Sequence, residues 1–187
     1  KNKEILTMRK EIFKEVEIPS GVEVEIDVDM ITFKGKKGDD SRKFSSGKIK
    51  LEKNGNKINI GTKGATKKEK RMINTFATHI KNMIDGVNEG YEYKLKVVYS
   101  HFPVTVELHG KEAIIKNFLG EKVPRKMKIL NGVNVKVEKD DIVVSSHNKE
   151  LAGQTAANFE RATRITLRDR RVFQDGIFIT SKAGEEI

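Results

Sequence analysis

The densest group of side chains that could do chemistry is a set of five arginines in residues 161–171: Arg161, Arg164, Arg168, Arg170 and Arg171. Each guanidinium presents a planar fork of N–H donors that matches phosphate oxygens, and it is less strongly hydrated than an ammonium group. Lysines dominate residues 34–81 instead, where a lysine-rich stretch is often only a solvated face. The net charge is +10 over 187 residues. The arginine cluster therefore predicts phosphate binding.

The sequence gives little support for a metal site, a reactive cysteine or an acid–base pair. The chain has no Cys, and its four histidines are far apart, with no paired spacing for a metal ion. Adjacent acidic pairs such as Asp39-Asp40 and Asp140-Asp141 follow strand-like runs at turn positions. Exposed turns do not supply the contrasting environments that split the pKa values of an acid–base pair. We therefore expect no enzyme activity, no metal and no cofactor.

Glycine pairs were compared with phosphate-binding loops. Residues 55–61 resemble the two Walker glycines with one extra residue between them, but the Lys-Ser/Thr pair that should follow is absent. Residues 35–38 and 61–64 have the Gly-x-x-Gly spacing of a K-homology domain, yet each follows a strand instead of joining two helices. What remains is nucleic-acid binding through basic surfaces and counterion release. Aromatic residues make up only 6%, which disfavours a protein that binds single strands by stacking.

The chain repeats itself. Val22–Ile26 is echoed by Val104–Leu108, and Ile31–Lys34 by Ala113–Lys116, at the same offset. In each half a second pair of strand-like runs and then a helical pattern follow in the same order. We interpret this as a tandem duplication with a boundary at Glu89-Gly90, giving domains 1–90 and 91–187.

Each domain is predicted to be α+β, a small antiparallel sheet packed on one helix. Val22, Val24 and Ile26 alternate with acidic residues, as in a strand with one wet face. Asn54-Gly55 predicts a hairpin turn, and Asp140-Asp141 its equivalent in the second domain. We expect Ser181–Ile187, with few side chains to bury, to be mobile.

Helix signals are equally specific. Thr66 and Glu69 form a capping box before a long apolar stripe, and Gly86 is predicted to end that helix. Asn148 is predicted to cap the second helix. The longest uncharged run, Val97–Val106, is too short to span a membrane, and no secretory signal is recognisable. A cytoplasmic protein is expected.

Five blocks carry a resemblance to a known family: Asn82–Val87, Gly90-Tyr91, His101–Pro103, Asn117–Lys122 and Arg171–Phe178. Together they closely resemble the large-subunit ribosomal protein family called L-six in bacteria and archaea and numbered nine in eukaryotes, in its archaeal form. The resemblance covers about residues 9 to 182. It implies two tandem α+β domains, binding to the large (23S-type) rRNA near the sarcin–ricin region, neighbouring large-subunit proteins, and translation factors docking nearby.

In that family the second domain makes most of the RNA contact. The resemblance therefore implies rRNA binding by the five arginines, together with four further cations: Lys122, Arg125, Lys126 and Lys182. Phe173 is expected to anchor the C-terminal segment in the core, and Asp175-Gly176 to form the tight turn that directs it. The alternative is a protein-interaction module with only generic RNA affinity, which the acidic strands of residues 11–29 favour.

Overall fold

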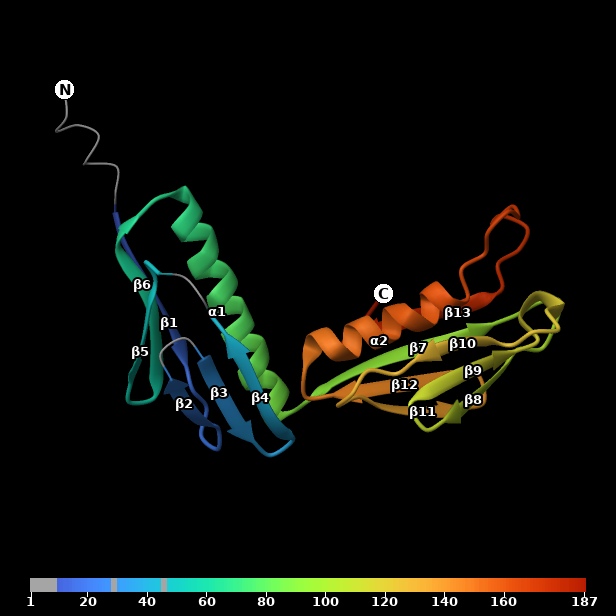
Figure 1. Ribbon diagram of the computed structural model, residues 1–187, viewed down its shortest axis with the longest axis horizontal. Coiled ribbons are helices and arrows are strands. Elements are labelled where there is room, and N and C mark those ends of the chain that lie inside the picture. Colours follow the sequence, from blue (N-terminus) through green and yellow to red (C-terminus); the bar gives the residue numbers. More distant parts are fainter. Residues whose placement is uncertain (1–9, 28–29, 45–46) are drawn as a thin grey trace, which may run out of the picture. The chain divides into compact units, whose positions relative to one another are not determined.

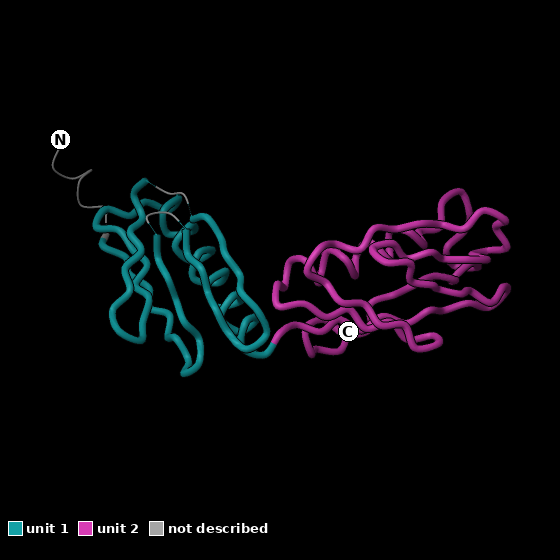
Figure 2. Tube along the Cα trace, turned by 60° about the horizontal axis from the view of Figure 1, so that its bottom comes forward, with its two compact units in different colours: residues 1–89 teal, residues 90–187 magenta. Residues whose placement is uncertain are grey.

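The chain divides into two compact units, residues 1–89 and 90–187, coloured separately in Figure 2. The computed structural model describes residues 10–27, 30–44 and 47–187. Within these residues each unit combines antiparallel strands with a single α-helix. The predicted α+β class, with one helix packed on strands in each copy, is confirmed.

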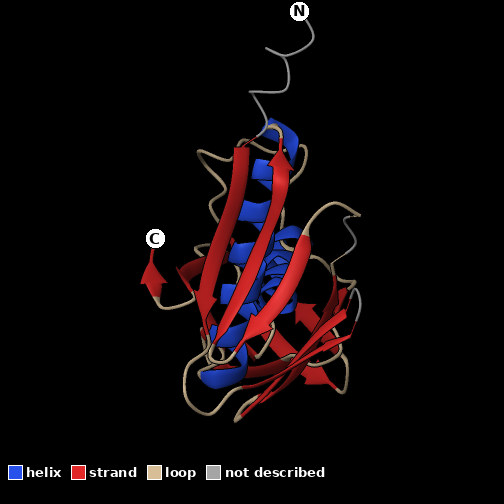
Figure 3. Ribbon diagram, turned by 90° about the vertical axis from the view of Figure 1, so that its left-hand side faces the viewer, coloured by secondary structure: helices blue, strands red, loops and turns tan. Residues whose placement is uncertain are grey.

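Unit 1 contains two three-stranded antiparallel sheets, with strand orders β1-β6-β5 and β2-β3-β4. The strands are β1 (Lys10–Glu17), β2 (Glu23–Asp27), β3 (Met30–Gly35), β4 (Gly38–Lys43), β5 (Lys50–Asn54) and β6 (Lys57–Ala65). Figure 3 looks onto this unit and shows its long strands lying along the helix, which contacts β1, β6 and β3. Val24 is buried between the exposed Glu23 and Glu25, as the alternation predicts.

Helix α1 (Lys67–Asn88) begins as predicted, with both halves of the Thr66–Glu69 capping box formed. Its buried face contributes Ile73, Ala77, Ile80, Met83, Ile84 and Val87 to the core. The predicted stop at Gly86 is wrong, because Gly86 is a buried residue within the helix. The left-handed residue is Gly90, with φ of 82°, directly after the C-cap Glu89.

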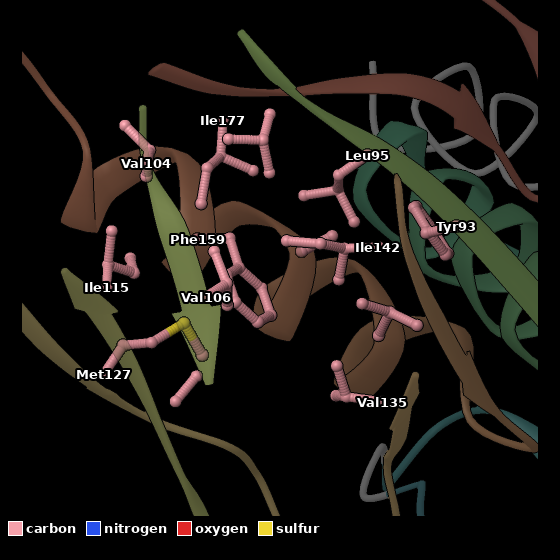
Figure 4. Close-up of a cluster of buried hydrophobic side chains, with 14 of the residues drawn as sticks. Tyr93, Leu95, Val104, Val106, Ile115, Met127, Val135, Ile142, Phe159 and Ile177 are labelled. Atoms are coloured by element: carbon pink, nitrogen blue, oxygen red, sulfur yellow. The ribbon is translucent and has the colours of Figure 1, made fainter. Parts of the chain in front are cut away.

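Unit 2 has the same arrangement of two sheets and a helix, with two further strands, the last two of the chain, in one sheet. Its strands are β7 (Tyr91–Val98), β8 (Thr105–His109), β9 (Glu112–Lys116), β10 (Arg125–Lys128), β11 (Asn134–Glu138), β12 (Asp141–Ser146), β13 (Gly176–Lys182) and β14 (Glu185–Glu186). A short 3-10 turn, η2 (Phe118–Gly120), precedes β10, and helix α2 (Lys149–Ala162), capped by Asn148 as predicted, precedes β13 (Figure 1). The strand orders are β11-β12-β7-β13-β14 and β10-β9-β8. Figure 4 shows Phe159 of α2 packed among strand residues such as Ile142 and Ile177.

Both predicted hairpins exist, but their turns lie one residue away from the expected positions. The two-residue loops are Gly55-Asn56 and Lys139-Asp140, because Asn54 and Asp141 remain paired in the strands. Gly55 and Lys139 adopt matching positive φ angles of 59° and 51°. The two turns therefore have equivalent geometry despite different residue types, in agreement with the duplication.

The C-terminal segment is more ordered than the sequence predicts. Ser181 is buried in β13, which continues through a turn into β14, and the Ile187 N–H donates to the Thr180 carbonyl. The expectation of a mobile segment from Ser181 was wrong because it overlooked a strand that extends to Lys182.

The tip of the β3–β4 hairpin packs directly on the last turn of α1. The Lys37 N–H donates to the Val87 carbonyl at 2.9 Å, and a Cβ added at Gly35 would lie 2.6 Å from that same oxygen. This contact requires glycine at position 35.

Gly35→Ala should destabilise unit 1 by about 1–3 kcal/mol, because the added methyl group forces strand and helix apart. The measurement is hydrogen exchange of the α1 amides. Gly47→Ala is the matched control, since nothing lies within 4 Å of a Cβ there. Equal exchange in the two variants would contradict the close approach.

Candidate nucleic-acid interface

The arginine cluster lies on the end of α2 and on the loop of residues 164–175 that joins α2 to β13, shown in red beyond the helix in Figure 1. We call these residues the arginine loop. Its first end is fixed by Thr163, which is 3% exposed. The Thr163 hydroxyl donates to the Phe159 carbonyl at 3.2 Å and accepts the Ile177 N–H at 3.0 Å. The end of α2 is thereby joined to the start of β13.

A second side chain of α2 strengthens this junction. Glu160 accepts the N–H of Ile179 at 3.0 Å, next to the irregularity in the pairing of β13 with β7. Ile177 and Ile179 lie where β14 does not pair with β13. Thr163 and Glu160 therefore satisfy N–H groups that no strand would satisfy at this edge.

The other end of the loop is fixed by Asp175, which is 1% exposed. Its Oδ1 accepts two hydrogen bonds from Ser100, one from the N–H at 3.1 Å and one from the hydroxyl at 3.0 Å. Burial raises the pKa of Asp175, but the Ser100 hydrogen bonds and the nearby His101 outweigh it and lower the pKa below its ordinary value. The carboxylate therefore remains ionised at neutral pH and ties the loop to the end of β7.

This geometry corrects the expectation of a tight turn at Asp175-Gly176. Gly176 begins β13 and pairs with Val98, while the turn lies earlier, where the Asp169 carbonyl accepts N–H groups from Val172 and Phe173. Asp-Gly is a frequent turn pair, but here the two buried Ser100 hydrogen bonds hold the chain extended.

Phe173 is half-buried, and it packs within the loop instead of entering the core. The Arg168 guanidinium lies 4.9 Å from the centre of its ring, and the His101 ring lies 5.5 Å away on a tilted plane. The apolar residue that enters the core at this point is Ile177, which is 1% exposed.

All five arginines of the cluster are exposed. Arg171 is paired with Asp169 at 2.8 Å, and this hydrogen-bonded pair lowers the pKa of the Asp169 carboxyl. Within the described part of the chain, the side chains of Arg161, Arg164 and Arg170 make no hydrogen bond or ion pair. Three guanidinium groups therefore remain available to an external anion.

The additional cations behave differently from one another. Lys122 is exposed before β10, Lys126 is exposed within β10, and Lys182 is exposed at the far end of β13. Lys182 is six residues along the strand from Gly176, roughly 20 Å at the usual strand rise, so it is separate from the arginine loop.

Arg125, one of the predicted phosphate contacts, has a structural role within unit 2. Its guanidinium donates to Glu121 at 2.6 and 2.8 Å and to the carbonyls of Ala162 and Arg164 at 2.8 and 3.3 Å. It also lies 4.4 Å from the centre of the Phe118 ring. Arg125 therefore holds the C-terminal end of α2 and presents few donors to solvent.

The glycine pairs compared with phosphate loops prove to be parts of strands and hairpins. Lys36 and Lys37 form the two-residue loop between β3 and β4, and residues 61–64 lie inside β6. Among residues 10–27, 30–44 and 47–187, no three His, Asp or Glu side chains are grouped so as to hold a metal ion. In that same part of the chain, no helix has the length and apolar character needed to cross a membrane.

The comparisons with known proteins converge on one family. The sequence model of the family "Ribosomal protein L6" matches the chain twice, over residues 18–90 and 102–176. The chain is similar to "Large ribosomal subunit protein uL6" of Methanosarcina mazei, with 49% identity over 94% of this chain and 100% of the relative. The proteins of the same name from Methanocella arvoryzae and Methanococcus vannielii are 48% and 44% identical, over 94% and 93% of this chain and 100% and 96% of their own lengths.

Asp175→Ala should loosen the arginine loop and destabilise unit 2 by about 1–3 kcal/mol, because it leaves the Ser100 donors without their acceptor. Asp175→Asn retains an acceptor oxygen and should have a smaller effect. Hydrogen exchange over residues 164–178 and chemical denaturation measure both. Exchange in Asp175→Ala that matches the wild type would show that the loop does not depend on this anchor.

Arg125→Ala should destabilise unit 2, since it frees the end of α2 and leaves Glu121 unpaired, whereas Lys126→Ala should leave stability within about 0.5 kcal/mol. Arg125→Lys should not restore stability, because an ammonium cannot reproduce the planar fork. Denaturation midpoints of the three variants provide the test. An unchanged midpoint for Arg125→Ala would contradict the structural role.

Proposed function

The chain belongs to the Ribosomal protein L6 family, and from this premise we propose that it is a structural constituent of the large ribosomal subunit that binds the large (23S-type) rRNA. The family match over both halves of the chain is the observation that supports this most strongly. Relatives named as large-subunit proteins at 44–49% identity support it further. The protein acts as part of an assembly and not as an enzyme.

The RNA contact is placed on unit 2, at the arginine loop and the end of α2. Arg161, Arg164 and Arg170 are exposed and lack partners within the described residues, and both ends of the loop are fixed by buried hydrogen bonds. Because the two ends of the loop are fixed, less backbone freedom is lost when its arginines bind phosphate. Lys122 and Lys126 extend the same basic surface, and Lys182 would be a separate contact.

The RNA region proposed is the one near the sarcin–ricin loop, which places the protein beside the site where translation factors dock. The resemblance of the sequence to its family supports this location. Its partners would then be the rRNA, neighbouring large-subunit proteins and, transiently, those factors. The proposed place of action is the cytoplasmic ribosome.

The alternative, docking of an acidic face of unit 1 onto a protein, is less well supported. Lys57 pairs with both Glu15 and Glu17, and Lys34 pairs with Glu25. These two lysines offset part of the acidic charge that suggested such a face.

Replacing Arg161, Arg164 and Arg170 together by Ala should weaken binding to an rRNA fragment carrying the sarcin–ricin region and reduce incorporation into large subunits. The slope of log affinity against log salt should fall in magnitude by roughly 0.7–0.9 for each phosphate that the variant no longer binds. Affinity and slope are both measured by titration at several salt concentrations, with a scrambled RNA of equal length as reference.

The matched control removes three positive charges from unit 1 instead, by replacing the exposed Lys67, Lys68 and Lys70 at the start of α1. It should retain affinity and salt slope more fully than the arginine variant. Equal losses would mean that only net charge matters. Wild-type protein that binds the scrambled RNA equally well would overturn the proposed function.

A further inference from the structure

Between α2, the arginine loop and β13 lies an open cavity of about 740 Å³. Its lining comes from Val98 of β7, from side chains at the end of α2 and just after it, from the second half of the arginine loop, and from Ile177 and Phe178 of β13. The volume falls within the range of about 300–1,000 Å³ usual for small-ligand pockets. The cavity lies entirely within unit 2.

One wall of the cavity is apolar and aromatic. Phe178 is 40% exposed, and its ring folds back along its own strand, so that a Cβ added at Gly176 would lie 2.9 Å from it. Val98, 39% exposed, and the half-buried Phe173 extend this wall. An aromatic ring held against a strand, with part of its surface uncovered, is suited to receive a second planar group.

The opposite part of the lining is cationic. Arg161, Arg164 and Arg170 all line the cavity, and none has a hydrogen-bond or ion-pair partner among the described residues. Glu160, also in the lining, is occupied by the Ile179 N–H, and Asp175 by Ser100. These three arginines outnumber the two carboxylates of the lining, so the cavity carries a net positive charge that favours an anion.

We propose that this cavity binds one unpaired nucleotide of the RNA, with its base against Phe178 and its phosphate at Arg164 and Arg170. The proposal rests on the proposed function and names which part of the RNA this site takes. A ligand that satisfies both walls must combine a flat, weakly polar group with an anion, which is the composition of a nucleotide. A phosphate alone would leave the aromatic wall uncovered.

The proposal also fits the composition of the chain. Folded RNA is commonly bound by shape and phosphate contacts, while sequence is read at bases that are splayed out and stacked on aromatic or guanidinium planes. With 6% aromatic residues the protein cannot stack a long single strand. A single aromatic wall beside a group of arginines is enough for one extruded base.

Phe178→Ala should weaken binding of the sarcin–ricin fragment by about 5- to 150-fold, the range for loss of one base–aromatic stack, and leave the salt slope unchanged. Phe178→Tyr should bind like the wild type. Phe13→Ala is the matched control, because Phe13 is also exposed and also lies over a strand glycine, Gly61 in unit 1. It should not change the affinity. Thermal unfolding of both alanine variants checks that they fold.

The nucleotide is identified by replacing each unpaired nucleotide of the fragment in turn with an abasic one. At one position the loss should match that of Phe178→Ala, and the two changes together should cost no more than either alone. Unchanged affinity for Phe178→Ala, or additive losses at every position, would overturn the cavity proposal while leaving the proposed function intact.

A measurement without the rRNA fragment tests the cavity proposal separately from the proposed function. Adenosine 5′-monophosphate and ribose 5-phosphate are titrated into isotope-labelled protein, and amide shifts are followed by NMR. The nucleotide should shift the amides of residues 176–178 more than the sugar phosphate does. Equal shifts would mean that the cavity binds phosphate alone, and the proposal would fail even if the rRNA fragment binds specifically.

Discussion

The N–H groups of Ile177 and Ile179 impose the constraint on which the candidate interface depends. They lie on a part of β13 that β14 does not cover, and Ile177 is buried, so both need acceptors. Thr163, the residue directly after α2, and Glu160 of α2 provide them. Each hydrogen bond contributes only about 0.5–1.5 kcal/mol, but leaving such a group buried without a partner costs about 1–3 kcal/mol. Separating α2 from β13 would leave these N–H groups without acceptors, and this free-energy cost keeps the junction closed. The start and the end of the arginine loop are therefore held together.

The same junction explains how the two units differ although they share a plan. In unit 1 the order β1-β6-β5 corresponds to β7-β12-β11 in unit 2, and β2-β3-β4 corresponds to β8-β9-β10. After α1 the chain passes through Gly90 into unit 2, whereas after α2 it returns as β13 along the free side of β7. The arginine loop is the connection that this additional strand requires. The site thus arises where the second copy departs from the first, and local sequence similarity between the copies cannot reveal it.

Much of the fold could be predicted because it depends on local patterns. The Thr66–Glu69 capping box, the alternation around Val24 and the repeated hairpins are each specified by residues close together in the sequence. Local patterns still misplaced the end of α1 and both hairpin turns by a few residues, whereas the roles of other residues are set by distant partners. Asp175 resembles a turn residue until Ser100, 75 positions away, is seen to donate to it, and Arg125 resembles any other surface cation until Ala162 and Glu121 enclose it. A signal for the cavity was present in Ile177-Phe178-Ile179, because alternation places the phenylalanine on the opposite face from two core-directed isoleucines.

Rigidity and unbalanced charge together make this loop suited to RNA. Asp169 and Asp175 are the acidic residues of the loop; Asp169 is paired with Arg171 and Asp175 is hydrogen-bonded to Ser100, and the arginines outnumber these two carboxylates. In a mobile loop of the same composition, the arginines could pair with the carboxylates of the loop. RNA binding would then have to break those ion pairs. Because Thr163 and Asp175 fix the two ends, the free guanidinium groups are presented before RNA arrives, and less conformational entropy is lost on binding. Phosphate affinity here therefore depends on buried hydrogen bonds that never touch the RNA.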